Sequence, residues 1–539
     1  MKGKNYLLFS FILLIFGLSL YLPFISGKEF QGEEGRRVLI ALQMLESGNF
    51  LFPHLFSEPY FNKPPLYNWI LALGFYIVGD YSEFTARTIS ALSLILCSIF
   101  MFLLWVKIWQ NIDEALFTQK SSIFFLLLPG FIFLTLPEVI DKALRAEIDG
   151  YYTLLITLSI FLWFYFHELK SKKKVAFLIS GFFIGLAVLT KTFHAIVFLY
   201  LAIIPYLLME KRLKELLGLN HLLGLLTVFI VFLMWALPVS MEIGISPFLK
   251  AWLQEYLHAT KGEAMPLSQH LESFTISALL GYSPWIFFLI SLGDIRFKSF
   301  LRENPIIKRL FLFSIIFFLS SYLFHFLFPG ARLRYALPAI GGLVYSVSIC
   351  ILFLLVKGIS FKTLSYLTKS IALFFLIFSV SFYFYLNKKN LELDFFFYLL
   401  LFLLLLINMF FLLRPVNLKT FIVYLIAIVF IVKHLYTTFY YPLHQREMNY
   451  YRKASFEIVK LIEPTRELYL CKVIPHHMIY YLKYRYRLVE NIHYLKSCEV
   501  LPTNSVVLML EKELNEQIIS KYKINTIIIR NKKYVLLFT

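Results

Sequence analysis

The sequence predicts an α-helical polytopic membrane protein that carries a small C-terminal α/β domain. Hydrophobic residues make up 59% of the 539 residues and charged residues only 16%, whereas a soluble globular chain carries about 25% charged residues. Long apolar segments recur along the chain as far as residue 435. Beyond that point the apolar runs shorten to the length of β-strands. These three observations define the fold class.

The apolar segments have the length of membrane-spanning helices. Such a helix needs about 20 mostly apolar residues, because the hydrocarbon core is about 30 Å thick and each residue rises about 1.5 Å. This rule predicts thirteen spans, and the apolar segment 66–78 is too short, so we expect a re-entrant or interfacial helix there. The predicted spans are residues 5–25, 84–106, 121–136, 149–167, 175–190, 193–209, 220–240, 273–292, 307–328, 335–356, 366–386, 393–413 and 418–435.

The first apolar segment follows two lysines, which is also the pattern of a signal peptide. We expect an uncleaved anchor instead, because the run is longer than a usual signal segment and no Ala-x-Ala site follows it. Lys and Arg concentrate in alternate short loops, which predicts a cytoplasmic N-terminus. Thirteen spans then place the C-terminal domain outside, although Lys388 and Lys389 oppose this topology and an even number of spans would reverse it.

The net charge of +19 is explained mostly by these loops. No basic patch with interleaved aromatic residues lies clear of the apolar segments, so we expect no nucleic-acid partner. The predicted domains are a transmembrane domain, residues 1–435, with long outer loops at 26–83 and 241–272, and a soluble domain, residues 436–539. Strands are expected at 467–473, 505–510, 526–529 and 533–538, and amphipathic helices near 452–462 and 511–521.

The four cysteines do not form a metal-binding pattern. Cys97 and Cys350 lie in apolar runs and are expected to be small core residues. Cys471 and Cys498 lie in the soluble domain. They are expected either to form a disulfide, if the domain faces an oxidising compartment, or to remain free thiols.

The first outer loop carries two adjacent carboxylates followed by two arginines, Glu33-Glu34-Gly35-Arg36-Arg37. Acidic residues followed by basic residues also suit an ordinary helix start. The functional interpretation is a carboxylate base beside cations that stabilise an anionic leaving group. Lys63, which precedes Pro64-Pro65, either snorkels at the interface or is aimed by the rigid turn at a phosphate.

Further ionisable residues lie at other predicted outer positions. If residues 141–149 are helical, Asp141, Arg145 and Asp149 lie on one face of the helix. The ordinary explanation of such a face is a surface stripe whose charges pair with one another. Asp149 nevertheless lies at the edge of a span, where an ionisable group is costly unless it faces a wet cavity. Lys191 stands between two apolar runs and is best explained by an anion site. His258 is either a surface residue or a functional one, and Arg332 and Arg334 contact lipid headgroups or a phosphate.

At these residues the sequence resembles the bacterial polyprenyl-phosphate-sugar glycosyltransferases of the aminoarabinose transferase and protein O-mannosyltransferase type, which have the GT-C membrane fold. The family pattern is Asp-Glu-x-Arg-Tyr, Glu-Lys-Pro-Pro, an Asp after the third span, Leu-Thr-Lys-Gly and Tyr-x-Leu-Pro. This chain has, in the same order, Glu33-Glu34-Gly35-Arg36-Arg37, Asn62-Lys63-Pro64-Pro65, Asp149, Leu189-Thr190-Lys191-Thr192 and Tyr335-Ala336-Leu337-Pro338.

The resemblance implies a role for each matching residue. Glu33 is the catalytic carboxylate, with Glu34 as the alternative because Glu is longer than the family's Asp, and Asp149 is the second essential carboxylate. The residues expected to bind the donor phosphate are Arg36, Lys63, Lys191, Arg332, Arg334 and Tyr335, with His258 matched by loop position alone. Asn62 replaces a Glu that helps hold a metal in aminoarabinose transferases, so no cofactor is certain and a divalent metal ion stays an open question.

The implied activity is that of an inverting glycosyltransferase, a hexosyl- or pentosyltransferase of the bacterial inner membrane with its C-terminal domain in the periplasm. Its donor would be a polyprenyl (undecaprenyl) phosphate-sugar, and its acceptor a hydroxyl or phosphate of lipid A in lipopolysaccharide, another glycolipid or a protein. The alternative is a polytopic transporter or lipid flippase, which would place charges near the bilayer midplane on broken helices.

Overall fold

The computed structural model describes residues 4–56, 58–61, 63–110, 123–250, 252, 266–388, 394–447, 450–462, 467–514, 516–529 and 532–539. The chain divides into two compact units. Unit 1 comprises Met1–Phe24, Ser90–Leu144 and Ile148–Phe439, and unit 2 comprises Ile25–Ile89, Arg145–Glu147 and Tyr440–Thr539. The domain boundary predicted after residue 435 stays a prediction. Unit 2 groups residues 25–89, which include the predicted loop 26–83, with the C-terminal residues.

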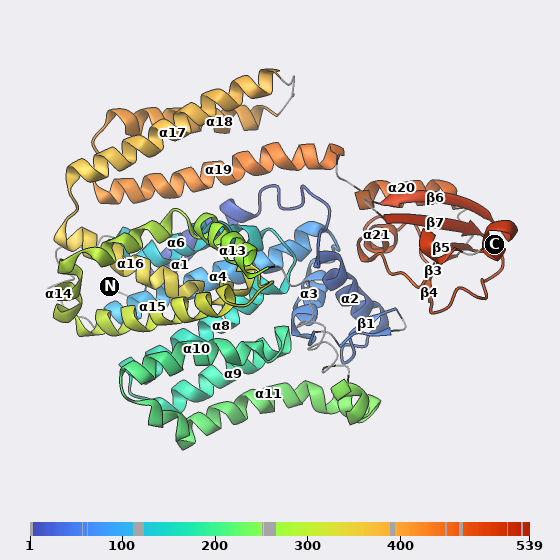
Figure 1. Cartoon of the computed structure of the whole chain (residues 1–539), viewed down its shortest axis with the longest axis horizontal. Helices are drawn as coiled ribbons and strands as arrows, with labels where there is room; N and C mark the ends of the chain where they lie inside the picture. The colour runs from blue at the N-terminus through green and yellow to red at the C-terminus, as the bar shows by residue number, and fades with distance from the viewer. Residues whose placement is uncertain are drawn as a thin grey trace. The chain divides into compact units, whose positions relative to one another are not determined.

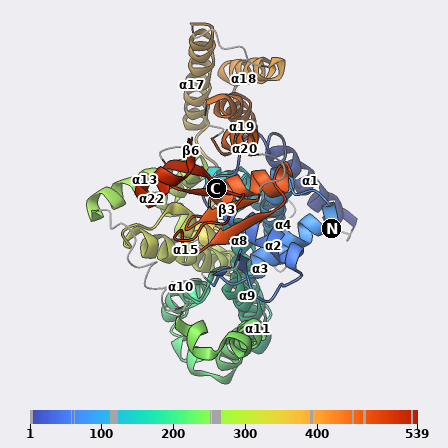
Figure 2. The same ribbon diagram turned by 90° about the vertical axis from the view of Figure 1, so that its right-hand side faces the viewer.

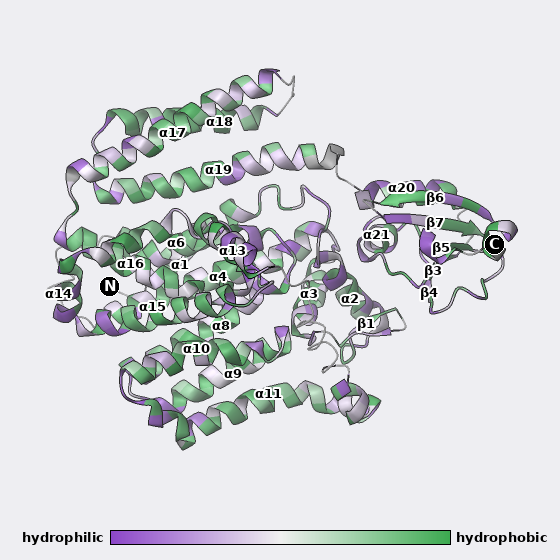
Figure 3. Cartoon of the chain, in the orientation of Figure 1, coloured by the Kyte–Doolittle hydropathy of each residue, from purple (hydrophilic) through white to green (hydrophobic). Residues whose placement is uncertain are grey.

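Unit 1 is helical over most of its described length, as the sequence predicted (Figure 1). Hydrophobic residues run along helices α16 to α19, coloured green in Figure 3. The elements lying wholly or mainly in this unit are α1 (Lys4–Tyr21), α4 (Glu83–Trp109), α6 (Ile123–Thr135), α7 (Pro137–Ala143), α8 (Ile148–Phe164), η1 (Tyr165–Leu169), α9 (Lys173–Lys191), α10 (His194–Met209), η2 (Leu213–Leu217), α11 (Leu219–Ile243), α13 (Leu267–Tyr282), η3 (Trp285–Gly293), α14 (Ile295–Glu303), α15 (Pro305–Phe326), η4 (Leu333–Tyr335), η5 (Leu337–Ala339), α16 (Ile340–Lys357), α17 (Phe361–Lys388), α18 (Phe395–Leu413) and α19 (Leu418–Glu447).

The described residues include nine helices long and apolar enough to cross a membrane, or eleven if each of two bent helix pairs counts as one span. The bent pairs are α6 with α7, at 63°, and α13 with η3, at 100°. Two further predicted spans correspond to α1 and α10, which are shorter apolar helices. The thirteen predicted segments are therefore all helical, but only eleven meet the length criterion. The protein is a multi-pass membrane protein.

Glycines allow two helices of unit 1 to approach closely. A Cβ atom at Gly181 of α9 would lie 2.2 Å from the carbonyl oxygen of Gly224 in α11, and one at Gly224 would lie 2.8 Å from that of Phe177. Small residues at such crossings let helix backbones pack directly, as they commonly do in membranes. Helices α9 and α11 lie side by side in both views (Figures 1 and 2).

Unit 2 contains a five-stranded sheet in the order β4-β3-β5-β7-β6. Strand β3 pairs in parallel with β4 and β5, and β7 pairs antiparallel with β5 and β6. The four predicted strands are confirmed, and β4 was missed. The remaining elements of unit 2 are α2 (Glu34–Ser47), β1 (His54–Leu55), β2 (Glu58–Pro59), α3 (Leu66–Val78), α20 (Tyr450–Leu461), β3 (Leu468–Cys471), α21 (His476–Ile479), η6 (Tyr480–Arg485), β4 (Ile492–Leu495), β5 (Val506–Leu510), η7 (Glu511–Glu513), α22 (Glu516–Lys521), β6 (Lys523–Ile529) and β7 (Lys532–Phe538).

The core of unit 2 joins the first outer loop to the C-terminal sheet. Leu39, Ile40 and Met44 of α2 are buried in one cluster with residues of the sheet and of α20, among them Leu468 and Ile458. Ile40 and Met44 are four residues apart and Leu39 adjoins Ile40, so the three side chains lie on one side of helix α2. Helix α2 therefore shares one hydrophobic core with the C-terminal sheet.

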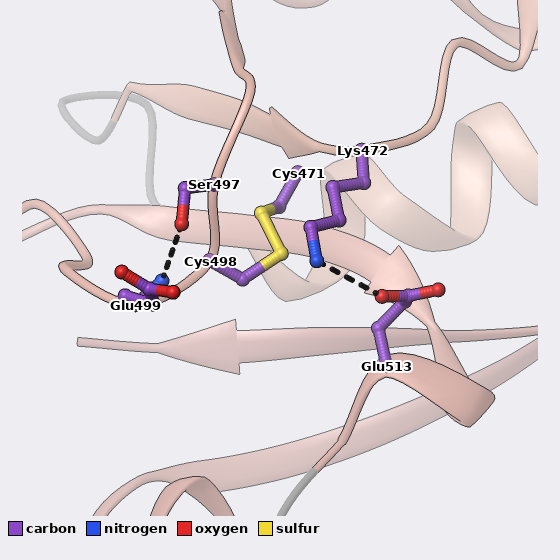
Figure 4. The surroundings of a disulfide bond; sticks show 6 residues. All are labelled: Cys471, Lys472, Ser497, Cys498, Glu499 and Glu513. Carbon is purple, nitrogen blue, oxygen red and sulfur yellow. Dashed lines mark hydrogen bonds and ion pairs between the residues drawn. A yellow bond between two sulfur atoms is a disulfide. The ribbon is translucent and has the colours of Figure 1, made fainter.

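A disulfide joins Cys471, the last residue of β3, to Cys498 (Figure 4). The two Cα atoms lie 5.8 Å apart, within the usual range for a disulfide. An ion pair between Lys472 and Glu513 at 3.4 Å lies beside the bond. Of the two alternatives that the sequence left open, the disulfide is the correct one. Cys97 and Cys350 are buried and free, as predicted.

Candidate active site

Unit 1 holds a buried ion pair at the ends of two neighbouring helices. Asp149 is the second residue of α8, and Lys191 is the last residue of α9. The Lys191 ammonium lies 2.6 Å from Asp149 Oδ1, and the two side chains are only 14% and 6% exposed. The pair satisfies both charges, which would be costly to bury separately.

Two tyrosines flank the Lys191 ammonium. Its Nζ atom lies 5.2 Å from the ring centroid of Tyr152 and 5.0 Å from that of Tyr335. A cation within about 6 Å of an aromatic face is attracted by the ring quadrupole. Tyr152 is fully buried, and its hydroxyl has no hydrogen-bond partner among the described residues. The ammonium is therefore fixed in position by one carboxylate and two rings.

Positive charge exceeds negative charge around Asp149. Besides Lys191, both Arg334 and Lys142 act electrostatically on its carboxylate. The Arg334 guanidinium also lies 5.5 Å from the Tyr335 ring centroid. Arg332 is exposed on the same short segment. We call Asp149, Tyr152, Lys191, Arg334 and Tyr335 the Lys191 cluster, and its charge suits an anionic ligand.

The residue after Lys191 has an unusual backbone conformation. Thr192 ends α9 with φ 113° and ψ −179°. This region is essentially restricted to glycine, and a residue with a side chain pays roughly 1–3 kcal/mol to occupy it. The family pattern has Gly at this position, so the substitution to Thr places strain directly beside Lys191.

Two histidines that the sequence analysis did not identify lie near the Lys191 cluster. The rings of His194, at the start of α10, and His325, near the end of α15, are 5.5 Å apart. His325 Nδ1 donates to the Ser321 carbonyl at 2.7 Å, and its buried Nε2 has no partner among the residues that the structure describes. Neither histidine belongs to a recognisable sequence motif, so the sequence alone did not identify them as site residues.

Unit 2 holds a second charged cluster at the start of α2. The Glu33 carboxylate lies 3.1 Å from Arg36 Nη1 and 3.6 Å from Arg37 Nη2. The Arg36 Nε–H donates to His476 Nε2 at 3.1 Å. Glu33 is 40% exposed and Arg36 is 33% exposed, so both are accessible to solvent. We call Glu33, Arg36, Arg37 and His476 the Glu33 cluster.

Glu34 is fully buried and bound by protein groups on both oxygens. Arg87 donates to Oε1 at 2.7 Å and to Oε2 at 3.0 Å, and the backbone amides of Ala146 and Gln31 donate to Oε1 and Oε2. Burial raises the pKa of Glu34, but the Arg87 guanidinium outweighs it and leaves the pKa below its usual value. The geometry therefore favours a structural role for Glu34 and leaves Glu33 as the accessible carboxylate.

The other predicted residues differ in their placement. Lys63 is partly buried and directly precedes Pro64, Pro65 and helix α3. His258 and Asn62 lie outside the described residues. Across the described part of the chain, no three His, Cys, Asp or Glu side chains form a group that could hold a metal ion. We therefore derive no step through a metal.

Residues 141–149 do not form one continuous helix, which a shared face of Asp141, Arg145 and Asp149 required. Helix α7 ends at Ala143 and α8 begins at Ile148, so these residues do not share one helix. Asp141 pairs instead with its neighbour Lys142, at 2.9 Å. The helix break also brings the Ala146 amide to Glu34.

Comparisons with known proteins support the resemblance. Residues 62–236 match the family model described as dolichyl-phosphate-mannose-protein mannosyltransferase. An undecaprenyl phosphate-alpha-4-amino-4-deoxy-L-arabinose arabinosyl transferase of Pseudomonas savastanoi is 32% identical over 39% of this chain and 37% of its own length. A relative of the same name from Proteus mirabilis is 26% identical over 61% of this chain and 57% of its own length. These alignments thus cover 37% and 57% of the two relatives, less than two thirds of either.

The fold is shared over the whole chain with a solved structure. The crystal structure of ArnT from Cupriavidus metallidurans bound to undecaprenyl phosphate superposes with a TM-score of 0.68 at 15% identity. The superposition covers 100% of this chain and 98% of that one. This chain therefore has the membrane-protein fold of that ArnT structure, as the resemblance predicted, together with a small C-terminal sheet domain.

Proposed function

We propose that this protein is an inverting membrane glycosyltransferase that moves a sugar from a polyprenyl-phosphate donor to an acceptor hydroxyl or phosphate. The observation that carries the proposal is the Lys191 cluster. The Lys191 ammonium is held by the Asp149 carboxylate and the rings of Tyr152 and Tyr335, so it is oriented before a ligand binds. Preorganised charge of this kind stabilises an anionic leaving group without reorganisation during the reaction.

The leaving group in this reaction is the polyprenyl phosphate. As the bond between the anomeric carbon and the phosphate oxygen breaks, negative charge grows on that oxygen. Lys191, Arg334 and the exposed Arg332 are the cations of unit 1 that stabilise this charge. Arg36 and Lys63 match donor-phosphate positions of the family pattern, and we propose that role for them from the sequence. Asp149 holds the Lys191 ammonium in place at 2.6 Å, and we do not assign it as the base because its side chain is only 6% exposed.

Glu33 is the carboxylate that takes the proton from an acceptor hydroxyl. Its contacts to Arg36 and Arg37 orient the carboxylate, while 40% of its side chain stays exposed. The acceptor oxygen then attacks the anomeric carbon from the side opposite the phosphate, which inverts the configuration. For a phosphate acceptor, which is already anionic, Glu33 has no proton to remove.

The relatives support this substrate class. The Pseudomonas and Proteus proteins are named for an undecaprenyl phosphate-linked aminoarabinose, and the Cupriavidus structure contains undecaprenyl phosphate. The matched segment 62–236 includes Lys63, Asp149 and Lys191. We therefore propose an undecaprenyl phosphate-linked sugar as the donor, and lipid A, another glycolipid or a protein as the acceptor.

We place the protein in a bacterial inner membrane with its N-terminus cytoplasmic and its C-terminal domain periplasmic. The disulfide between Cys471 and Cys498 supports this orientation, because disulfides persist in oxidising compartments and are rare in the cytosol. A lipid-linked donor also suits the outer face, where nucleotide sugars are absent. A divalent metal stays a proposal without an assigned ligand set, and comparing activity in EDTA and in added Mg²⁺ or Zn²⁺ tests it.

The competing function is a transporter or lipid flippase. Its strongest support is Lys433, a buried lysine inside α19, and its neighbour His434. Lys433 Nζ donates to the Pro23 carbonyl at 3.1 Å, and His434 Nε2 lies 3.2 Å from the Ser19 carbonyl. These contacts tie α19 to the first helix and its following turn, which gives both residues a structural explanation. Asp149 and Lys191 lie at helix ends rather than at helix centres, which favours the enzyme.

The test is transfer from a radiolabelled undecaprenyl-phosphate sugar in membranes that contain the protein, with products identified by mass. We expect Glu33→Gln and Lys191→Met each to reduce transfer by roughly 10²–10³-fold. Two variants are matched controls. Glu46→Gln removes a carboxylate of α2, the helix that also carries Arg36, and this carboxylate pairs with Lys483. Lys173→Met removes an ammonium at the other end of α9 from Lys191. Full activity in both test variants, with normal protein levels, would overturn the proposal.

A further inference from the structure

The side chain of Arg36 is held from two directions. Its Nη1 atom contacts Glu33 at 3.1 Å, within the same turn of α2. Its Nε–H donates at 3.1 Å to Nε2 of His476, which lies 440 residues later in the sequence and begins helix α21. A long side chain that is held at both Nε and Nη1 keeps the plane of its guanidinium fixed.

The contact between α2 and α21 is close and is built into the core. A Cβ atom at Gly35 would lie 2.7 Å from His477 Cδ2 and 3.2 Å from His477 Cα, so only glycine fits between Glu34 and Arg36. The Phe30 amide donates to the Tyr481 hydroxyl at 2.9 Å, and that hydroxyl donates to Glu83 at 2.9 Å. The hydrogen bond to Arg36 is therefore one part of a packed arrangement.

His476 is a neutral hydrogen-bond acceptor in this arrangement. Burial lowers its pKa to about 3, and the charges of Arg36, His477 and Arg37 act in the same direction. Its Nδ1 atom is buried and has no partner among the described residues. A protonated imidazole would present an N–H to the Arg36 N–H and break the bond, so the neutral ring is the form that fits.

We propose that His476 is a positioning residue for Arg36, so that the C-terminal domain sets the geometry of a residue that binds the donor phosphate. This inference rests on the proposed function for the role of Arg36. It gives the C-terminal domain a part in catalysis, although that domain carries no catalytic motif of its own. His476 acts only through Arg36 and does not touch the substrate.

The inference predicts a specific pattern of kinetics. Hydrogen bonds to charged groups contribute more free energy than hydrogen bonds between neutral groups. We therefore expect loss of this one to lower kcat/KM by about 10–100-fold. His476→Phe removes the acceptor and keeps a ring in the site, whereas His476→Gln can still accept through its amide oxygen. We expect His476→Gln to restore kcat/KM to within about threefold of the wild-type value, since one neutral acceptor replaces another.

A double-mutant cycle separates positioning from a general structural effect. The four proteins are the wild type, Arg36→Met, His476→Phe and the double variant, each assayed in full-length form in membranes. If His476 acts through Arg36, the double variant is no slower than Arg36→Met alone. His493→Phe is the matched control, because His493 is half-exposed on β4 and pairs with Glu467 at 3.4 Å.

The outcomes distinguish the two proposals. Wild-type activity in Arg36→Met would overturn the role of Arg36 in the proposed function. If Arg36→Met is impaired and His476→Phe is normal, the positioning role is overturned and the proposed function stands. The same conclusion follows if the losses of kcat/KM in the two single variants multiply in the double variant. Should His476→Phe fail to accumulate, the cycle is run with His476→Ala and His476→Gln, and equal loss in both contradicts the inference.

Discussion

The Lys191 ammonium lies 2.6 Å from the Asp149 carboxylate, and 42 residues of chain separate the two. The pair joins the outer ends, in the proposed topology, of helices α8 and α9. Breaking a buried ion pair by removing one partner typically costs about 3–5 kcal/mol, because the other charge is left buried and unpaired. Removing both partners together costs less than removing either.

This relationship predicts non-additive stability. Asp149→Asn and Lys191→Met should each destabilise the purified protein in detergent by about 3–5 kcal/mol, and the double variant should lose less than either single variant. Thermal unfolding followed by intrinsic fluorescence measures the difference. Asp141→Asn is the control, since Asp141 is 43% exposed in its pair with Lys142. Additive losses in the double variant would contradict the structural coupling.

The strain at Thr192 predicts a stabilising substitution. Thr192→Gly should raise the free energy of unfolding by about 1–3 kcal/mol, because glycine adopts φ 113° without a side-chain clash. Thr190→Gly, inside α9, should instead lower it by about 0.5–1 kcal/mol, since glycine is unfavourable in a helix interior. The same unfolding assay compares the two variants. A loss of stability in Thr192→Gly would show that Thr192 is not strained.

Glu33 and Glu34 are neighbours with opposite expected phenotypes. Glu34→Gln should reduce the amount of folded protein, because it leaves the buried Arg87 guanidinium without its carboxylate, at a cost of about 3–5 kcal/mol. Glu33→Gln should leave protein levels unchanged and reduce transfer by roughly 10²–10³-fold. Size-exclusion profiles and the transfer assay on the same preparations measure both properties. The reverse pattern would assign Glu34 as the base.

The sequence alone predicted which segments are helical but not which of them bend. Hydropathy reports how long an apolar run is, and it carries no information on direction. The bend between α6 and α7 follows Leu136, where Pro137 begins a new helix, and Pro284 stands at the break between α13 and η3. Both prolines were visible signals of a helix end, and counting apolar residues ignored them.

The site was only partly predictable for a related reason. Asp149 and Lys191 are conspicuous because a charge at the end of an apolar run is costly. Arg87 carried the same signal inside the predicted span 84–106 and was overlooked. His476 carried no local signal at all, because its partner Arg36 is far away in the sequence and the two are joined only by the packing of α2 against the C-terminal sheet.

The disulfide predicts both stability and orientation. Replacing Cys471 and Cys498 by serine should destabilise the C-terminal sheet by about 3.5 kcal/mol, the chain-entropy value for a closed loop spanning 27 residues. In spheroplasts, a membrane-impermeant maleimide should label these cysteines only after external reduction. Cys350→Ala provides the control for the buried free thiols. Labelling without reduction, or only after membrane lysis, would contradict the proposed periplasmic location.

His476 predicts that the stability of unit 2 depends on pH. Its pKa is about 3 in the folded protein against 6.5 for an ordinary histidine. Between these two values the unfolded chain binds more protons at this residue than the folded chain does. The free energy of unfolding therefore falls as pH falls below 6.5, by up to about 1.4 kcal/mol per pH unit.

Chemical unfolding of the wild type and of His476→Gln at pH 7.5, 6.5 and 5.0 measures this contribution. The wild type should lose about 2 kcal/mol more than the variant between pH 7.5 and pH 5.0, because glutamine does not titrate. His493→Gln, which removes a half-exposed histidine of the same sheet, is the matched control. Parallel pH curves for the wild type and His476→Gln would mean that His476 binds a proton as readily when folded as when unfolded. Arg36 would then have no neutral acceptor at this position.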